Sequence, residues 1–294
     1  MSRPRRNDVP SPRWPRSTLL TTGPIPGTVI NCSGALPVGN HVFHCWRKAG
    51  HGPVNLHRAM VHSCDIYFYE VGRRLGIDRI HEWSRRFGLG APTNLDLDKE
   101  VPGLAPSQAW KKARFHQPWR EGDTISVSIG QGYNLTTPIQ MARVVAAIAN
   151  GGKIYKPYVV EKVESPAGEI LYRAKPEVQS RLGASPATLE AVRESLVGVV
   201  NTGTGKAARL GHIQVAGKTG TAQVVAIDRD NPKKKQARSR EDHAWFVAYA
   251  PADDPRVAVA VLVEHGGHGG SEAGPLASRV IKAHLSESNV AQAQ

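Results

Sequence analysis

The sequence predicts a mixed α/β domain of the α+β type, in which helices flank an antiparallel sheet. Three observations support this class: segments with helical spacing dominate the first part of the chain, strand-like runs cluster near its end, and residues 251–255 form a link short enough for a hairpin. The chain has 294 residues, 40% of them hydrophobic, which suffices for an ordinary globular core. We expect one domain over residues 25–286, preceded by a disordered basic leader at 1–24 and followed by a disordered tail at 287–294.

Apolar residues at helical spacing predict the first helices. They cover residues 56–61 and 66–75, on either side of Ser63-Cys64-Asp65, and a further helix is expected over 78–87. Residues 124–129 are rich in β-branched side chains and predict a short strand.

The best-defined helix begins at Thr137-Pro138-Ile139-Gln140. This segment is a capping box with proline at the first helical position, and Asn150-Gly151-Gly152 supplies the stop. A later helix is expected from Ser185-Pro186 to about residue 200.

Strands are predicted next, over residues 213–225, 244–250 and 257–264. The last run is apolar almost throughout, which is typical of a central strand covered on both faces. Because the link between the last two runs is short, we expect these strands to be antiparallel neighbours. A closing helix is expected over residues 275–285.

The formal net charge of +13 is compatible with an anionic partner but does not select one. Much of the basic excess lies in two runs, at residues 3–16 and 233–240, and such runs are usually solvated tails or loops. The second run has no interleaved aromatic residue, so we expect no nucleic-acid partner. No apolar stretch approaches the roughly 20 residues that span a bilayer, and no signal-peptide core follows the first arginines.

Two short motifs carry chemistry. Lys218-Thr219-Gly220-Thr221 places a cation, two hydroxyls and a backbone N–H along one strand edge, as recognition of a carboxylate and a developing oxyanion requires. Alone, this motif is as readily a turn, and Ser63-Cys64-Asp65 is as readily a helix N-cap. Together and in this order, they match the second and third motifs of the acyl-serine transferases.

The flanks of both motifs resemble the penicillin-binding protein 2 family, the elongation-specific D,D-transpeptidases, from about Gly27 to Leu285. The segments that carry the resemblance are Gly50-His51-Gly52, Ser63-Cys64-Asp65-Ile66-Tyr67-Phe68-Tyr69, Gly76-Ile77-Asp78-Arg79-Ile80, Trp119, Gly122-Asp123-Thr124, Ile129-Gly130-Gln131-Gly132-Tyr133, Thr137-Pro138-Ile139-Gln140-Met141 and Asp242-His243-Ala244-Trp245-Phe246.

The resemblance implies a penicillin-binding transpeptidase fold, similar to that of the β-lactamases, with the Lys-Thr-Gly strand at the edge of the active site. It implies a proton relay through Ser63, with Asp65 replacing the more usual Asn near the substrate peptide. Lys218 would supply positive potential, and the Thr221 N–H would be one oxyanion donor. The substrate-binding residues would be Thr219, Gly220 and Thr221.

One motif of the family is missing from the sequence. These enzymes attack the D-Ala-D-Ala carbonyl with the serine of a Ser-x-x-Lys motif, and no serine of this chain has a lysine three residues later. Removing a nucleophile typically costs about a million-fold in turnover, so we expect no acyl-enzyme on the chain as printed. We interpret the chain as N-terminally truncated. The alternative is a non-catalytic fragment that binds peptidoglycan or a protein partner.

Residues 27–52 are irregular and rich in Gly and Pro, and such a long loop is expected to be functional or cross-linked. The chain's three cysteines, Cys32, Cys45 and Cys64, lie in or near it together with His51. Three thiolates and one imidazole form a closed tetrahedral set for a structural Zn²⁺, and the odd count argues against a purely disulfide account. One disulfide plus a free thiol remains the alternative, because the family works in the oxidising periplasm.

The resemblance also implies partners and a location. The partners would be peptidoglycan stem peptides, β-lactams and membrane proteins of the elongation complex. Members of the family are periplasmic and anchored in the inner membrane, although this sequence shows neither a signal nor a membrane-spanning segment. No organic cofactor is expected.

Overall fold

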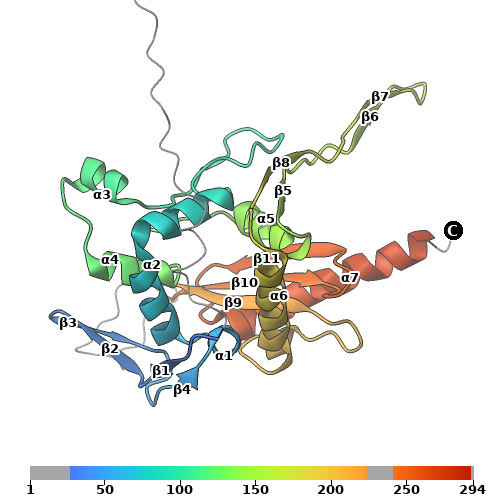
Figure 1. The fold of residues 1–294 in the computed structure, drawn as a ribbon. Helices are drawn as coiled ribbons and strands as arrows, with labels where there is room; N and C mark the ends of the chain where they lie inside the picture. Colours follow the sequence, from blue (N-terminus) through green and yellow to red (C-terminus); the bar gives the residue numbers. More distant parts are fainter. Residues whose placement is uncertain (1–26, 224–240, 293–294) are drawn as a thin grey trace, which may run out of the picture.

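The computed structural model describes residues 27–223 and 241–292, so the expected leader and the basic run at 233–240 lie outside it. A three-stranded antiparallel sheet occupies the centre, in the order β11–β10–β9 (Figure 1). The strands are β9 (Ala216–Ala222), β10 (His243–Ala250) and β11 (Val257–Val263). They confirm that three strands lie in these regions, although the first begins at Ala216 and not at residue 213, and its expected end at residues 224–225 is not described. The last two are antiparallel neighbours, as expected. The apolar last run was expected to be a central strand, but among the described residues β10 is the central strand and β11 lies at an edge.

Helices cover both faces of this sheet, which confirms the α+β class. Alternate residues of β10, such as Phe246, pack with α7 (Gly274–Gln292) on one face. Tyr249 instead packs on the other face with α5 (Pro138–Ala149) and α6 (Pro186–Asn201). Figure 1 shows α6 crossing the sheet with α7 beyond it. Because α7 continues to Gln292, the chain is helical over residues 287–292, where a tail was expected.

The predicted capping box of α5 is present. The Thr137 hydroxyl accepts the Gln140 N–H at 3.3 Å, and the Gln140 side chain accepts the Thr137 N–H at 3.0 Å. At the start of α6, the Ser185 hydroxyl accepts the Thr188 N–H at 3.1 Å. Both helices therefore begin where their sequence signals place them.

The first helices differ in part from the prediction. α1 (Leu56–His62) is as expected, but the next two predicted helices form one element, α2 (Asp65–Arg86), with a kink at Gly76 (φ 73°, ψ 163°). The expected strand at 124–129 is wrong: the segment lies largely in α4 (Glu121–Ser128). The Asp123 carboxylate accepts the Arg120 N–H at 2.7 Å and caps this helix, so local capping and packing outweigh the β-branched composition. The pattern also missed α3 (Gln108–Phe115).

The segment expected to be irregular, residues 27–52, contains short strands. β1 (Ile30–Cys32) pairs with β4 (Gly52–Val54), and β2 (Ala35–Val38) pairs with β3 (His41–His44). The strands are too short and too rich in Gly and Pro to show a clear alternation in the sequence. They pack on α2 in a second apolar core.

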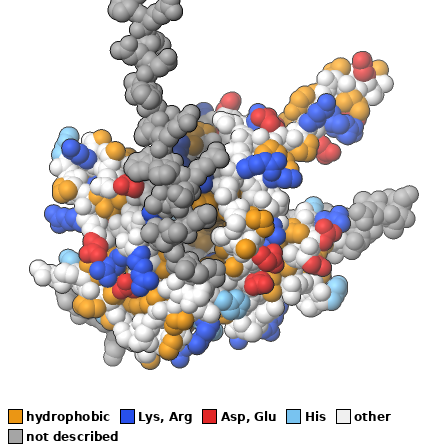
Figure 2. Space-filling view, in the orientation of Figure 1, with side chains coloured by type: hydrophobic (Ala, Val, Ile, Leu, Met, Phe, Trp, Pro, Cys, Tyr) orange, Lys and Arg blue, Asp and Glu red, His pale blue; other side chains and the backbone are white. Residues whose placement is uncertain are grey.

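A hairpin arm projects from the body (Figure 1). Its base pairs β5 (Lys153–Tyr155) with β8 (Val178–Arg181), and its outer part pairs β6 (Lys162–Glu164) with β7 (Ile170–Arg173). Figure 2 shows hydrophobic, basic and acidic side chains intermixed on the arm. Among the described residues, none of the helices has both the length and the apolar character of a membrane span.

Gln140 gives a test of the buried polar framework. Its side chain is 1% exposed, and Nε2 donates to the carbonyls of Ala91 and Pro102 at 2.8 Å each. Gln140→Leu leaves these carbonyls and the Thr137 N–H without a partner, so we expect a loss of about 3 kcal/mol in the free energy of unfolding, measured by urea denaturation. The exposed Gln108 is the matched control, and Gln108→Leu should change stability by no more than about 0.5 kcal/mol. Equal losses in the two variants would contradict this assignment.

Candidate functional site

The Lys-Thr-Gly-Thr segment lies on β9, the outer strand of the central sheet, whose far edge has no strand partner among the described residues. The Thr219 carbonyl accepts a hydrogen bond from Lys218 Nζ at 3.1 Å, and the Thr221 carbonyl accepts one from Gln131 Nε2 at 2.6 Å. In an antiparallel strand the N–H and C=O of one residue point to the same side. The N–H groups of Thr219 and Thr221 therefore face the free edge, whereas Gly220 faces β10.

Ser63 reaches this edge from the junction between α1 and α2. It ends α1 in the left-handed conformation (φ 50°), and its N–H bonds to the Met60 carbonyl at 3.3 Å. Lys218 Nζ donates to Ser63 Oγ at 2.5 Å, which joins residues 155 positions apart in the sequence. The two motifs predicted to form one site are therefore in contact.

Thr204 connects the two motifs through hydroxyl groups, and the sequence analysis missed it. Its Oγ1 lies 3.2 Å from Ser63 Oγ and 2.9 Å from Thr219 Oγ1. The preceding Gly203 allows the approach, since a Cβ there would lie 2.2 Å from the Val61 carbonyl oxygen. The only signal available was the Gly-rich run after α6, which marks a tight turn without indicating chemistry.

Asp65 begins α2 beside Ser63, and its carboxylate accepts the Trp46 backbone N–H at 2.8 Å. Burial raises the pKa of Asp65 to about 6, partly opposed by that hydrogen bond. The Trp46 indole donates to the carbonyls of His62 and Ser63 at 3.0 and 2.9 Å. This ring is 60% exposed, so a fixed aromatic surface borders the motif that the sequence identified.

Lys218 is the cation of the site. Burial lowers its pKa from an ordinary 10.5 to about 8, and the Asp65 carboxylate opposes part of this shift. A neutral fraction is therefore accessible near neutral pH, so Lys218 can exchange a proton with Ser63 as well as supply charge.

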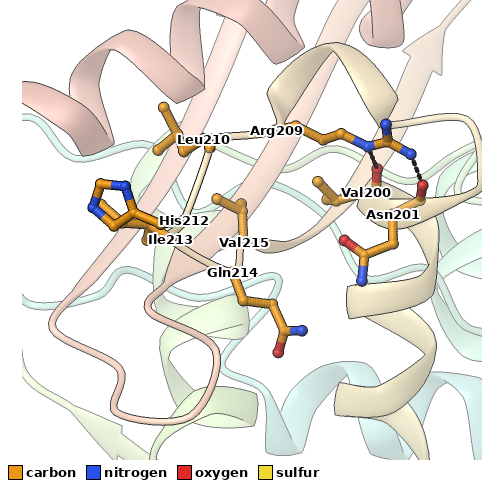
Figure 3. Close-up of a pocket in the computed structure, with 9 residues that line it drawn as sticks. Val200, Asn201, Arg209, Leu210, His212, Ile213, Gln214 and Val215 are labelled. Carbon is orange, nitrogen blue, oxygen red and sulfur yellow. Dashed lines mark hydrogen bonds between the residues drawn. The ribbon is translucent and has the colours of Figure 1, made fainter.

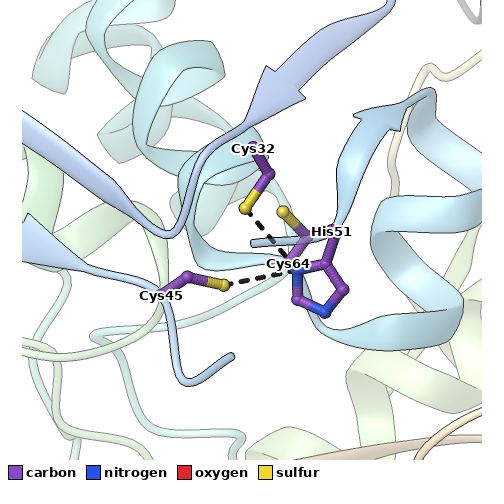
Figure 4. Close-up of side chains that lie close together, drawn as sticks. All are labelled: Cys32, Cys45, His51 and Cys64. Atoms are coloured by element: carbon purple, nitrogen blue, oxygen red, sulfur yellow. Dashed lines mark hydrogen bonds between the residues drawn. The ribbon is translucent and has the colours of Figure 1, made fainter. Parts of the chain in front are cut away.

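The four predicted metal ligands come together at one point (Figure 4). Their ligating atoms lie within 4.8 Å of one another, and all four residues are buried. His51 Nδ1 lies 3.6 Å from the Cys32 sulfur and 3.4 Å from the Cys45 sulfur. All three cysteines are free thiols in this structure, which therefore does not contain the disulfide of the alternative interpretation.

The electrostatics of this cluster favour a thiolate. A hydrogen bond from the Cys64 thiol holds the pKa of Cys45 well below its usual range, and the same contact raises the pKa of Cys64. A low-pKa sulfur among thiols and an imidazole is the donor chemistry of a tetrahedral zinc site.

A separate cavity of about 240 Å³ lies between the end of α6 and the segment that leads into β9 (Figure 3). There, Arg209 Nε donates to the Val200 carbonyl at 3.2 Å, and a second guanidinium nitrogen reaches the Asn201 carbonyl. None of the predicted site residues lines this cavity.

Comparison with known proteins identifies the family. The penicillin binding protein transpeptidase domain matches residues 18–282 of the chain. The chain belongs to this family. The transpeptidase domain is 39% identical over 275 residues to the peptidoglycan D,D-transpeptidase MrdA of Haemophilus influenzae, and the match covers 89% of this chain and 41% of that protein. The chain thus spans about two fifths of the length of this relative.

Solved structures agree with this assignment. The transpeptidase domain superposes on the penicillin-binding protein PBP2 of Helicobacter pylori, in its complex with MreC, with a TM-score of 0.76 and 34% identity, covering 89% of this chain and 46% of that one. An imipenem acyl-enzyme complex of penicillin-binding protein A from M. tuberculosis gives a TM-score of 0.73 and 27% identity, covering 92% and 57% of the two chains. The fold expected from the resemblance is therefore confirmed.

Lys218 should titrate near pH 8 in the folded protein. Between this value and 10.5 the unfolded chain binds more protons than the folded one, so this group's contribution to stability should increase as the pH rises through that window. The measurement is NMR of the lysine Cε resonances across pH, with Lys218→Arg to assign the signal. A midpoint near 10.5 for Lys218 would show that burial does not depress its pKa.

Proposed function

We propose that this chain provides the substrate-binding side of a peptidoglycan D,D-transpeptidase site, which acts on D-Ala-D-Ala stem peptides in cell-wall elongation. The observation that carries the proposal is the 2.5 Å contact of Lys218 with Ser63 at the free edge of β9. An extended peptide can add to this edge as a further strand. The edge offers a cation, hydroxyl groups and two outward N–H groups, which suit a terminal carboxylate and a polarised carbonyl.

In this proposal the residues of the two motifs have distinct roles. Ser63 and Lys218 relay a proton, and Asp65 lies near the peptide backbone of the substrate. Thr219 and Thr221 bind the terminal carboxylate through their hydroxyls, and the Thr221 N–H stabilises the oxyanion. Glycine at position 220 avoids a close contact with the neighbouring strand, because a Cβ there would lie 3.1 Å from the Trp245 Cβ.

The printed sequence contains no Ser-x-x-Lys, so we infer that the chain by itself binds the substrate without forming an acyl-enzyme. The lack of a Ser-x-x-Lys motif in this sequence also favours a second candidate function, a non-catalytic module that binds peptidoglycan or a partner protein through the same edge. The two functions share the peptide site and differ in covalent chemistry.

Peptide binding tests the site directly. We expect saturable binding of an N-acylated D-Ala-D-Ala peptide by calorimetry, and Thr221→Val should weaken it about tenfold, because a hydrogen bond to a carboxylate is lost. Valine suits a strand, so the fold should persist. Thr202→Val, at an exposed threonine after α6, is the matched control and should leave the affinity unchanged. No binding by the parent chain would contradict the proposed site.

Intact-mass analysis after incubation with benzylpenicillin separates catalysis from binding. We expect no covalent adduct on the 294-residue chain, because it has no acylating serine with a lysine one turn on. An adduct would overturn the inference that this chain is inactive alone, and its position would identify the nucleophile.

We further propose that Cys32, Cys45, His51 and Cys64 bind a structural Zn²⁺. The residues fit this ion: tetrahedral Zn–S and Zn–N bonds place neighbouring ligand atoms roughly 3.5–3.8 Å apart, and the observed upper limit is 4.8 Å. His51 Nδ1 faces the sulfurs and would be its ligating atom. Four protein ligands leave no position for water, so the ion would join β1, β3 and β4 to the start of α2 and would not take part in the reaction.

Protein purified without added metal should contain about one zinc per chain by elemental analysis. Its thiols should react slowly with a thiol reagent until a chelator is added, because bound thiolates are protected. Cys45→Ser should lose the zinc, whereas His44→Ala, at an exposed histidine of β3, should retain it. Free titration of all three thiols without chelator would rule the zinc site out.

Family membership supports a proposal about partners. The Helicobacter pylori protein was solved with MreC, and the M. tuberculosis protein as an acyl-enzyme with imipenem. For this chain we propose peptidoglycan stem peptides, β-lactams and membrane proteins of the elongation complex as partners, with a periplasmic location at an inner-membrane anchor.

A further inference from the structure

The carboxamide of Gln131 occupies the free edge of β9 where the strand ends. Its Nε2 donates to the Thr221 carbonyl at 2.6 Å, and its Oε1 accepts the Gln223 N–H at 3.4 Å. One donor and one acceptor, directed to alternate residues on one edge, reproduce the pattern that a neighbouring strand presents. A single side chain therefore replaces a strand at the end of β9.

The turn that carries Gln131 is itself tied to α4. The Gln131 N–H bonds to the Ser126 carbonyl at 3.0 Å, and Asn134 Nδ2 donates to the Val127 carbonyl at 3.1 Å. Gly132 has φ +69°, which glycine adopts readily, and a Cβ there would lie 3.2 Å from the Ser126 Cβ. The backbone of Gln131 is thus fixed by contacts with α4, independently of the hydrogen bonds that its side chain forms with β9.

Tyr133 joins the same turn to α3. Its ring centroid lies 5.1 Å from that of Trp110 and 5.6 Å from that of Phe115. Lys111 Nζ lies 5.7 Å from the Tyr133 ring centroid and forms an ion pair with Asp123 of α4. Lys111 is only 3% exposed, so this pairing holds α3, α4 and the turn as one unit.

We propose that Gln131 is a positioning residue, which holds the backbone of Thr221 through its carbonyl, so that the N–H of the same residue faces the acyl site. The identity of the group that this N–H binds rests on the proposed function. The hydrogen bonds by which Gln131 restrains the end of β9 are a property of the fold and do not depend on that function. β9 has a strand on one side only, and the ends of such strands open readily. An oxyanion donor is effective only when it is already oriented, so the end of β9 needs a second support.

The bond from Gln131 does not block the edge. A carbonyl oxygen has two lone pairs, so the Thr221 carbonyl can accept a peptide N–H of an extended ligand while it is bonded to Nε2. Gln131 and a bound peptide would then lie along the same edge, the peptide beside Thr219 and Thr221, and the carboxamide beside Gln223. The end of the peptide site would accordingly be set by the turn at residues 130–134.

Amide hydrogen exchange of the ¹⁵N-labelled chain tests, without any ligand, whether the Gln131 side chain restrains the end of β9. Gln131→Met keeps the length of the side chain and loses both hydrogen bonds. We expect the Gln223 amide to exchange roughly 5- to 10-fold faster and the Thr221 amide resonance to shift, with unchanged exchange at the Lys218 and Gly220 amides, which face β10. Gln131→Glu retains the acceptor for Gln223 but not the donor, so it should shift Thr221 and leave Gln223 protected.

The control is Gln108→Met, at an exposed glutamine of α3 that donates to Asp78 at 3.0 Å. It should leave the Gln223 and Thr221 amides as in the parent chain. Unchanged exchange of Gln223 in Gln131→Met would overturn the proposal. Faster exchange across the whole of β9 would also overturn it, because the side chain would then support the strand in general and not its end.

The D-Ala-D-Ala peptide adds a functional measurement. Gln131→Met should weaken peptide binding about 5-fold at an unchanged melting temperature, because only the orientation of the Thr221 N–H changes. Unchanged affinity together with faster Gln223 exchange would overturn the role in binding. A parent chain that binds no peptide would contradict the proposed function, while the exchange data would still decide whether Gln131 holds the strand.

Discussion

The contact between the Lys218 ammonium and the Ser63 hydroxyl fixes how the two parts of the chain fit together. Lys218 belongs to the central sheet, and Ser63 belongs to the helix junction packed against the N-terminal strands. A cation that leaves water needs compensation, and here it comes from the hydroxyls of Ser63 and Thr219, the Thr219 carbonyl and the nearby Asp65 charge. If this contact were lost, a partly buried cation would lose its main partner. The geometry of the site and the packing of the fold therefore depend on the same two groups, the Lys218 ammonium and the Ser63 hydroxyl.

Much of the fold was predictable because its signals are local. The capping box at Thr137 and Gln140 places the start of α5 without any knowledge of its neighbours. The short link before β11 sets the antiparallel pairing of the last two strands. The convergence of Cys32, Cys45, His51 and Cys64 was also predictable, because an odd number of cysteines beside a histidine is not explained by disulfides alone.

The parts that escaped prediction depend on distant residues. α4 carries β-branched residues that favour a strand, yet Asp123 caps it and also pairs with the buried Lys111, which the local sequence does not reveal. Thr204 is an ordinary threonine in a glycine-rich turn until Ser63 and Thr219 approach it from two directions. Trp46 likewise gains its significance only from the carbonyls that its indole reaches. A motif identifies the residues whose chemistry is unusual, and tertiary packing selects the ordinary residues that complete the site.

Ser63, Cys64 and Asp65 occupy consecutive positions with three different backbone conformations: left-handed at the end of α1, extended at φ −75° and ψ 105°, and the first turn of α2. The middle residue, Cys64, is fully buried within the Cys/His cluster, so a shift of its side chain would move both the hydroxyl before it and the carboxylate after it. Substitutions around the sulfur cluster and substitutions at Lys218 consequently act on the same short stretch of backbone, and their effects should not add. The junction between α1 and α2 thus couples the cysteine cluster of this chain to the Lys218–Ser63 contact, which makes it a point of epistasis between two otherwise separate groups of residues.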